Sequence, residues 1–258
     1  MLGFQKLLGT AAFGVALAIG VQKDELGYQD TPLIPGTKWH IHDGLRPQPP
    51  VVTPGDTSGS APSDATVLFD GTNLDAFEGG PWALKDGVMT VNGSGKIKTK
   101  ESFGNCQLHL EWRAPSYEET GPKTQARGNS GVFFFDRYEI QILDCYDNPT
   151  YPDGMTAALY GQYPPMSNAC KAPGEWQSYD IMFTAPLFAN GRAVRGAFVT
   201  VLHNGVCVHH AQLSLGSTQH KKIASYETHR STGPISIQDH GSPVSFRNIW
   251  VRKLEPAQ

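Results

Sequence analysis

The sequence has no excess of basic residues. Its 258 residues include 21 Lys and Arg against 24 Asp and Glu, which gives a formal net charge of -3. Domains that bind nucleic acids usually carry a positive surface that neutralises phosphates. The charge balance therefore argues against a nucleic acid as partner.

Long apolar runs are also scarce. One lies between Leu7 and Val21, after Lys6, and no other segment is long enough to cross a bilayer. Such a run is short for a membrane span but suits a signal peptide, with Ala16–Ala18 as a candidate cleavage site. We expect residues 1–21 to be a signal peptide or a retained anchor and the protein to be secreted or periplasmic. Once the signal is removed, we expect no stable membrane insertion.

Cysteines are few, and no C-x-x-C motif occurs among the four. This argues against a zinc ribbon or a thioredoxin-type redox site. An exported chain with four cysteines allows three disulfide pairings. Cys106 and Cys207 fall on predicted strands and read as buried thiols, whereas Cys145 and Cys170 flank a long loop. If a bridge exists, we expect it between Cys145 and Cys170.

Residues 22–62 are rich in Pro, Gly and Ser. Such a composition cannot build a packed core, so the segment is predicted to be an arm or linker. It contains His40 and His42 followed by Asp43, which together could bind a divalent metal, although two histidines are a weak signal. We favour an arm segment pinned by Trp39.

Residues 63–258 are predicted to form one all-β domain. Frequent glycine and proline, together with 10% aromatic residues, favour many short strands joined by turns. About ten to thirteen strands without a good helix indicate a β-sandwich or jelly roll. We predict strands at Ala65–Phe69, Trp82–Leu84, Val88–Val91, Lys96–Thr99, Cys106–Arg113, Val132–Phe135, Tyr138–Ile142, Ser178–Thr184, Ala197–Leu202, Val206–His210, Ile235–Gln238 and Val244–Leu254.

The stretch R-G-N-S-G-V-F-F-F-D-R-Y-E-I-Q-I-L-D from Arg127 to Asp144 stands out. It predicts two strands joined by a tight turn at Asp136-Arg137. In the second strand, Tyr138, Ile140 and Ile142 face one side. Glu139 and Gln141 then share the other face, with Cα atoms about 6.6 Å apart, which suits a binding cleft. The alternative is a half-exposed strand with a solvated polar face.

Between Cys145 and Gln177 the sequence shows no strand pattern. Irregular segments of this length inside a compact domain are usually functional loops. The segment contains Tyr160, Asn168 and Trp176, and aromatic rings with amide neighbours are typical of sugar sites. We expect it to wall the cleft beside Glu139, although an aromatic loop can also simply close one end of a sandwich.

Several short motifs follow one another along the predicted domain. They are L-F-D-G-T-N-L, Trp82 with the Asp86-Gly87 pair, R-G-N-S-G-V-F, Y-E-I-Q-I-L-D, N-A-C-K-A-P-G-E-W-Q-S-Y-D, G-P-I-S-I-Q-D-H-G and F-R-N-I-W-V-R. Together they resemble the 3-keto-disaccharide hydrolase family. The resemblance covers Thr66 to Leu254 and implies a concanavalin-like jelly roll that acts on oxidised glycosides in secreted or periplasmic bacterial proteins.

The resemblance implies elimination chemistry on a carbohydrate. A ketone at C3 acidifies the C2 proton, so a base can remove it, the C1 substituent leaves, and hydration completes a net hydrolysis. We expect Glu139 to be the base, or a ligand if a divalent metal serves as the electrophile. Arg127 would hold the oxyanion and His240 would transfer a proton, unless Arg127 pairs with a carboxylate and His240 only shapes a turn.

Further candidates would bind the substrate, and the sequence indicates no definite cofactor beyond the option of that divalent metal. The expected substrate-binding residues are Lys98, Asn129, Gln141, Asp144, Tyr160, Asn168 and Trp176.

Two other functions stay open at this point. Glu139 to Asp144 is similar to the E-x-D-x-x-E strand of laminarinase-type retaining glycosidases, whose two carboxylates stand about 5 to 5.5 Å apart. Here the central Asp is Gln141, and alternation turns Asp144 away from Glu139 unless a bulge intervenes. A non-catalytic carbohydrate-binding module would need the aromatic cleft but no base.

Overall fold

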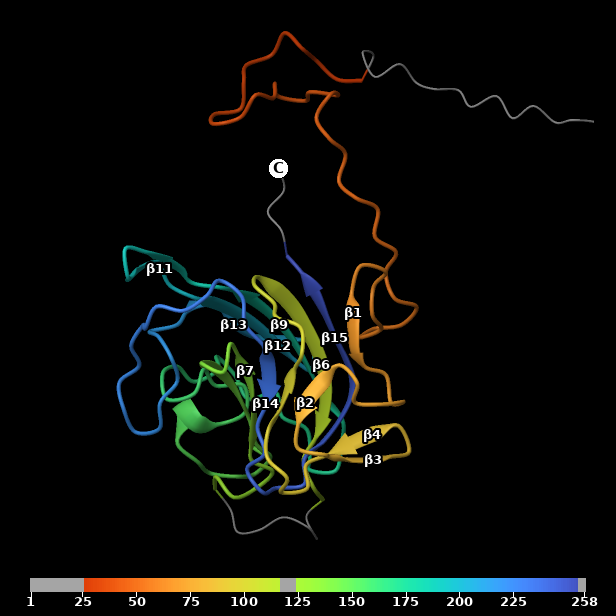
Figure 1. Cartoon of the computed structure of the whole chain (residues 1–258), viewed down its shortest axis with the longest axis vertical. Coiled ribbons are helices and arrows are strands. Elements are labelled where there is room, and N and C mark those ends of the chain that lie inside the picture. The colour runs from red at the N-terminus through yellow and green to blue at the C-terminus, as the bar shows by residue number, and fades with distance from the viewer. Residues whose placement is uncertain (1–25, 117–123, 255–258) are drawn as a thin grey trace, which may run out of the picture. The chain divides into compact units, whose positions relative to one another are not determined.

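The computed structural model describes residues 26–116 and 124–254, and the chain divides into two units, Met1–Val51 and Val52–Gln258 (Figure 1). The expected signal peptide lies outside the described residues. Within them, no helix is both long and apolar enough to span a membrane.

The second unit is all-β, as predicted. Its described part contains fifteen strands and a single 3₁₀ turn, η2, at Pro152–Gly154. The strands are β1 (Thr66–Phe69), β2 (Phe77–Gly79), β3 (Ala83–Lys85), β4 (Val88–Thr90), β5 (Ile97–Thr99), β6 (Cys106–Arg113), β7 (Ser130–Phe134), β8 (Tyr138–Ile142), β9 (Gln177–Thr184), β10 (Leu187–Ala189), β11 (Arg192–Arg195), β12 (Phe198–His203), β13 (Val206–Leu213), β14 (Ile235–Ile237) and β15 (Ser245–Lys253).

Two antiparallel sheets form the sandwich. The eight-stranded sheet has the order β13-β12-β9-β6-β15-β4-β3, with β1 paired to β15, and the five-stranded sheet has the order β2-β5-β14-β7-β8. In Figure 1 the strands of the five-stranded sheet overlap those of the eight-stranded sheet in the view, with β7 drawn beside β9. Phe134 of β7 stacks on Phe183 of β9 with ring centroids 4.4 Å apart, so the apolar core lies between the sheets.

Alternation in the sequence correctly predicts which residues enter this core. On β8, Tyr138, Ile140 and Ile142 belong to it, and the tight join to β7 is a turn at 135–137. Glu139 and Gln141 face away from the core, yet both are buried. The alternative of a solvated polar face is therefore wrong, because loops cover this side of β8.

The prediction missed β2, β10 and β11. β10 and β11 pair only with each other, and Leu187 and Val194 on them are exposed. A hairpin without a buried face has no apolar alternation to detect. β2 is three residues long and ends at Gly79, which has a positive φ.

The division between arm and domain falls earlier in the chain than Ser63. Residues 52–62 belong to the sandwich unit. The carbonyl of Gly59 accepts hydrogen bonds from the Trp250 indole at 2.8 Å and the Asn248 amide at 2.9 Å. A truncation that preserves the domain should therefore begin near Val52.

In the first unit, the carboxylate of Asp43 accepts hydrogen bonds from the Gln29 amide at 2.6 Å and the Leu45 backbone at 2.8 Å. It thus closes a turn of the arm. Across residues 26–116 and 124–254, no group of three or more His, Cys, Asp or Glu is placed to hold a metal ion.

All four cysteines lie in the described part, and each is a free thiol, so the expected Cys145–Cys170 bridge is absent. Cys145 accepts a hydrogen bond from the Thr156 backbone at 3.0 Å, and Cys170 accepts one from Gln177 at 3.3 Å. Cys106 is buried as expected. Cys207 is exposed, contrary to expectation, because β13 is an edge strand.

Candidate active site

A cavity of about 460 Å³ lies on the face of the five-stranded sheet that points away from the core. We call it the Glu139 cavity. Five of the predicted site residues line it, namely Asn129, Glu139, Gln141, Tyr160 and His240. Six further residues complete the lining: Gln125, Phe133, Tyr151, Thr218, His220 and Gln238.

The pairing of β7 with β8 makes room for the Glu139 carboxylate. Phe133 lies opposite Glu139 and Gly131 lies opposite Gln141. A Cβ atom on Gly131 would stand only 2.6 Å from Oε1 of Glu139. Glycine at this position of the R-G-N-S-G-V-F motif therefore leaves the space that the carboxylate occupies.

Two segments cover the free edge of β8. The Tyr160 backbone N–H donates to the Glu139 carbonyl at 3.2 Å, and the Gln141 N–H donates to the Ala158 carbonyl at 3.0 Å. The Glu139 N–H donates to Oγ1 of Thr218 at 3.2 Å. Tyr160 thus lies beside Glu139. The first half of the long loop walls the cleft as predicted, whereas Asn168 and Trp176 of its second half do not line the cavity.

The environment of Glu139 changes its acidity. The residue is 5% exposed, and none of the described residues donates a hydrogen bond to its carboxylate. Burial raises the pKa of Glu139 from its ordinary value of 4.5 to about 8. A carboxyl group with a pKa near neutrality can both accept and return a proton at physiological pH.

An amide network presents oxygen acceptors to the cavity. Nε2 of Gln141 donates to Oε1 of Gln125 and to the Gly154 carbonyl, both at 3.2 Å. Oε1 of Gln141 is buried and has no hydrogen-bond partner among the described residues, and the same holds for Oε1 of Gln238. Buried acceptors are normally paired. Two that are not can accept hydrogen bonds from the hydroxyl groups of a sugar.

A turn after β14 carries His240 to the rim of the cavity. The carboxylate of Asp239 accepts hydrogen bonds from the backbone N–H groups of Gly95 and Gly241, both at 2.9 Å. The Gln238 N–H donates to the Gly131 carbonyl at 2.9 Å. His240 is exposed on this fixed turn, so its ring can reach a bound ligand.

Arg127 and Asp144 do not line the cavity. Both are buried, and the Arg127 guanidinium donates to the Asp144 carboxylate. Burial raises the pKa of Asp144, although the Tyr146 N–H and Arg127 act in the opposite direction. In this arrangement Arg127 neutralises a buried carboxylate rather than facing a ligand.

Lys98 and Asn168 also lie away from the cavity. Lys98 pairs with Glu78 at 3.1 Å, two strands from β7. The Asn168 side chain donates to the Cys145 carbonyl and accepts from the Cys170 N–H, both at 3.0 Å. Asn168 therefore shapes the loop that carries it.

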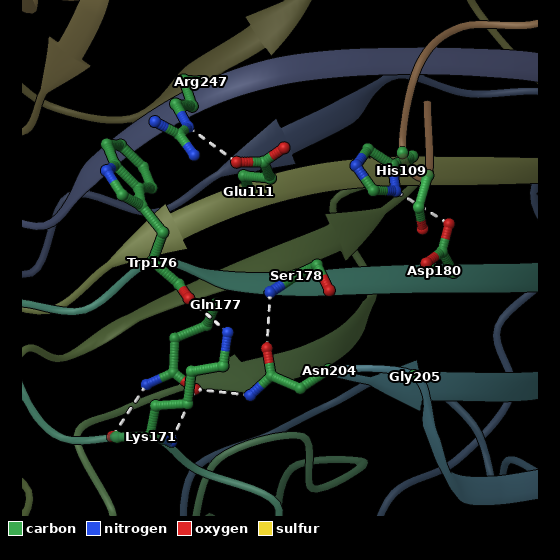
Figure 2. A pocket seen from close by; sticks show the side chains of 12 residues that line it. His109, Glu111, Lys171, Trp176, Gln177, Ser178, Asp180, Asn204, Gly205 and Arg247 are labelled. Atoms are coloured by element: carbon green, nitrogen blue, oxygen red, sulfur yellow. Dashed lines mark hydrogen bonds and ion pairs between the residues drawn. The ribbon is translucent and has the colours of Figure 1, made fainter. Parts of the chain in front are cut away.

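Trp176 lies in another cavity, of about 390 Å³, on the outer face of the eight-stranded sheet (Figure 2). We call this the Trp176 pocket. The guanidinium carbon of Arg247 lies 4.1 Å from the centroid of the Trp176 ring, and that of Arg113 lies 4.9 Å from it. Glu111, beside them, pairs with Arg247 at 2.6 Å.

Sequence reasoning did not name six of the eleven described residues that line the Glu139 cavity. Thr218 and His220 belong to a segment without strand periodicity. Contacts with residues distant in the sequence hold them there, since Thr218 bonds to Arg137 and Glu139, and His220 bonds to Tyr160. No sequence signal marks them. Gln238 belongs to G-P-I-S-I-Q-D-H-G, so the motif pointed to it, although its role did not follow from the residues.

A β-sandwich with this cavity belongs to the jelly-roll class found among glycosyl hydrolases. The family of 3-keto-alpha-glucoside-1,2-lyase-like domains matches residues 64–252, and the chain belongs to this family. It is 25% identical over 240 residues to a 3-keto-disaccharide hydrolase of Bacteroides thetaiotaomicron, a match that covers 73% of this chain and 78% of that protein. The protein is thus a carbohydrate-active hydrolase of that family.

Solved structures agree with this assignment. A candidate glycosyl hydrolase from Parabacteroides distasonis is 44% identical and superposes with a TM-score of 0.78, covering 86% of this chain and all of its own. A second candidate glycosyl hydrolase from the same organism is 24% identical, with a TM-score of 0.55, covering 74% of this chain and 99% of its own. This second match supports the fold alone.

Proposed function

We propose that this protein cleaves 3-keto-glycosides by removing the C2 proton, followed by elimination and hydration. The observation that carries the proposal is the state of Glu139. Among the described residues that line the cavity it is the only carboxylate, it is nearly buried, and its pKa of about 8 suits a base at neutral pH. The family relationship supplies the substrate class.

The proposed reaction assigns one task to each group. Glu139 takes the C2 proton, and the electron pair moves into an enolate on the C3 oxygen. The enolate then expels the substituent at C1, which takes a proton from His240 as it leaves. Water adds across the resulting C1–C2 double bond, and the net reaction is hydrolysis.

The enolate must be stabilised by a donor that lines the cavity. Because Arg127 is paired with Asp144, we assign this task to the hydroxyl of Tyr160, which lines the cavity on the side where its backbone contacts Glu139. The alternative role of Glu139 as a ligand to a divalent metal stays a prediction.

The retaining-glycosidase alternative needs a second carboxylate about 5 to 5.5 Å from the first. None of the described residues lining the Glu139 cavity other than Glu139 is acidic. Asp144, which the strand motif suggested, is buried against Arg127. These observations favour elimination over double displacement.

Isotope chemistry tests the proposal. A 3-keto-glycoside deuterated at C2 and its unoxidised parent are incubated with the protein, and release of the aglycone is followed. We expect cleavage of the keto compound only, with slower turnover of the deuterated form or replacement of deuterium by solvent hydrogen at C2. Normal turnover with full retention of deuterium would instead make Glu139 a nucleophile. Saturable binding without cleavage of either compound would indicate a binding module.

Export is part of the proposal and is supported by the apolar segment between Leu7 and Val21. Expression of the full chain in a Gram-negative host, followed by cell fractionation and N-terminal peptide mapping, tests it. A mature N-terminus near Ala18 in the periplasm is expected, and an intact N-terminus in the cytoplasm would reject export.

A further inference from the structure

A second cavity adjoins the Glu139 cavity and shares a wall with it. It measures about 370 Å³, and Tyr151, Tyr160 and His220 line both cavities. We call it the Ile223 cavity after the residue at its edge. Both volumes lie within the range of about 300 to 1,000 Å³ that is usual for small-molecule sites. A ligand bound against Glu139 can therefore extend past the shared wall into a second binding space.

The shared wall is held in place by its own contacts. The Tyr160 hydroxyl lies 3.1 Å from the Tyr151 hydroxyl and 3.0 Å from Nδ1 of His220. The rings of Tyr160 and His220 stack at an interplanar angle of 20°. These contacts orient the Tyr160 hydroxyl, and the rings of the wall offer flat apolar surface to a ligand.

The two loops that carry the wall are also pinned together. Nε2 of Gln162 donates to the Gly216 carbonyl at 3.1 Å, and Oε1 of Gln162 accepts from the Leu215 N–H at 2.7 Å. On the other side, the Gly161 N–H donates to the Asp153 carbonyl at 2.8 Å. The Ile223 cavity is therefore formed before a ligand arrives, which lowers the entropic cost of binding.

The exposed surface of this cavity is apolar where a ligand would lie. Ile223 is 91% exposed, although it is a large aliphatic residue, and Tyr151 is also exposed. Lys221 and Lys222 flank Ile223 in the sequence and line the same cavity. Burying an apolar ligand against Ile223 and the tyrosine rings would remove this surface from water.

We propose that the Ile223 cavity binds the leaving group of the substrate and prefers a flat apolar aglycone, such as an aryl group, over a small one. The proposal rests on the proposed cleavage of 3-keto-glycosides at Glu139. The oxidised sugar occupies the Glu139 cavity, and its C1 substituent crosses the wall of Tyr151, Tyr160 and His220. The Ile223 cavity thus contributes to substrate choice and takes no part in proton transfer.

The test compares phenyl and methyl 3-keto-glucosides with the wild type and Ile223→Asn. Val194→Asn is the matched control, because Val194 is 59% exposed on β11 and lines neither cavity. Phenol is also the better leaving group, so each substrate is compared across proteins rather than with the other substrate. We expect Ile223→Asn to raise KM about fivefold or more for the phenyl compound only. Val194→Asn should leave both values unchanged.

An equal change for both substrates, or no change for either, would overturn the proposal. If the wild type cleaves neither compound, the proposed function fails, and the Ile223 cavity is judged by binding instead. Calorimetry with phenyl and methyl glucoside then supports the subsite if the wild type binds the phenyl compound more tightly and Ile223→Asn abolishes the preference. Equal binding of the two compounds to the wild type would overturn it.

Discussion

The Glu139 cavity and the Trp176 pocket contain similar residues that differ in their hydrogen-bond partners. Each lies on the outer face of one sheet and holds a carboxylate, amide groups and an aromatic ring. In the Trp176 pocket the carboxylate of Glu111 accepts hydrogen bonds from Arg247 at 2.6 Å and from Asn248 at 2.9 Å. In the Glu139 cavity the carboxylate has no such donor among the described residues.

The amide groups differ in the same way. In the Trp176 pocket, Oε1 of Gln177 accepts hydrogen bonds from Asn204 at 2.9 Å and from the Lys171 N–H at 3.0 Å (Figure 2). Oε1 of Gln141 in the Glu139 cavity has no partner among the described residues. In a structural network the buried polar groups pair with one another, whereas a ligand site leaves some of them unpaired. An unpaired buried group is costly unless a ligand pairs with it.

The largest effect should separate the two carboxylates. Glu139→Gln is expected to lower kcat by about 10²- to 10⁴-fold while sugar binding survives, because the amide keeps the shape but cannot act as the base. Glu111→Gln is the matched control on the other face and should retain activity within about twofold. Turnover of a 3-keto-glycoside and calorimetric binding measure both. Similar losses in the two variants would remove the distinction between the cavities.

The buried and the exposed ion pairs should differ in stability. Arg127→Ala leaves Asp144 buried without this cation, so we expect a loss of about 3 kcal/mol or more in the free energy of unfolding. Arg247→Ala breaks the more exposed pair with Glu111 and should cost about 1 kcal/mol or less. Urea unfolding at pH 7 measures both. Loss of turnover in a stably folded Arg127→Ala would instead return Arg127 to the oxyanion role.

The pH dependence should report the burial of Glu139. Its folded pKa of about 8 lies above the ordinary 4.5, so the folded state favours the neutral carboxyl. The protonated Glu139 side chain therefore contributes to the free energy of unfolding fully below pH 4.5. This contribution is lost as the pH rises to about 8, by about 1.4 kcal/mol for each pH unit. The Tm of Glu139→Gln should therefore rise relative to that of the wild type between pH 5 and pH 8.

Ionisation of Glu139, which lowers stability as the pH rises, should increase the catalytic rate over the same pH range. Because the base must be deprotonated, kcat/KM of the wild type is expected to rise with pH and to level off above about 8. A difference in stability that does not change with pH, or an activity plateau that begins near pH 5, would show that Glu139 has an ordinary pKa.

Sequence periodicity predicted what is local. The alternation on β6 and β8 gave the core face and placed Glu139 with Gln141, since a strand has only two faces. The short separate hairpin of β10 and β11 left no pattern, because neither of its faces is buried. The division at Val52 also escaped prediction, because it depends on the Gly59 carbonyl meeting residues near the end of the chain.

The candidate site was predicted where one strand carries it and missed where separate segments meet. Asn129, Glu139 and Gln141 lie on or next to β7 and β8, and the structure brings them together. Residue type alone could not tell Trp176 from Tyr151, since both are aromatic residues of one loop. The course of that loop between the two faces of the sandwich decides which of them reaches the cavity.

The smallest effect should come from Trp176, which the sequence suggested as a substrate-binding residue. Its ring contacts the guanidinium groups of Arg113 and Arg247 on the other sheet, and it does not line the Glu139 cavity. Trp176→Ala should leave KM for a 3-keto-glycoside within about twofold of the wild type. Trp176→Ala should instead lower stability, because each lost contact between a cation and the ring is worth about 0.5 to 1 kcal/mol at an exposed site.

Tyr160→Ala is the comparison variant, because Tyr160 comes from the same loop but lines the Glu139 cavity. Tyr160→Ala should therefore raise KM. A rise in KM for Trp176→Ala as large as that for Tyr160→Ala would mean that substrate reaches both faces of the sandwich.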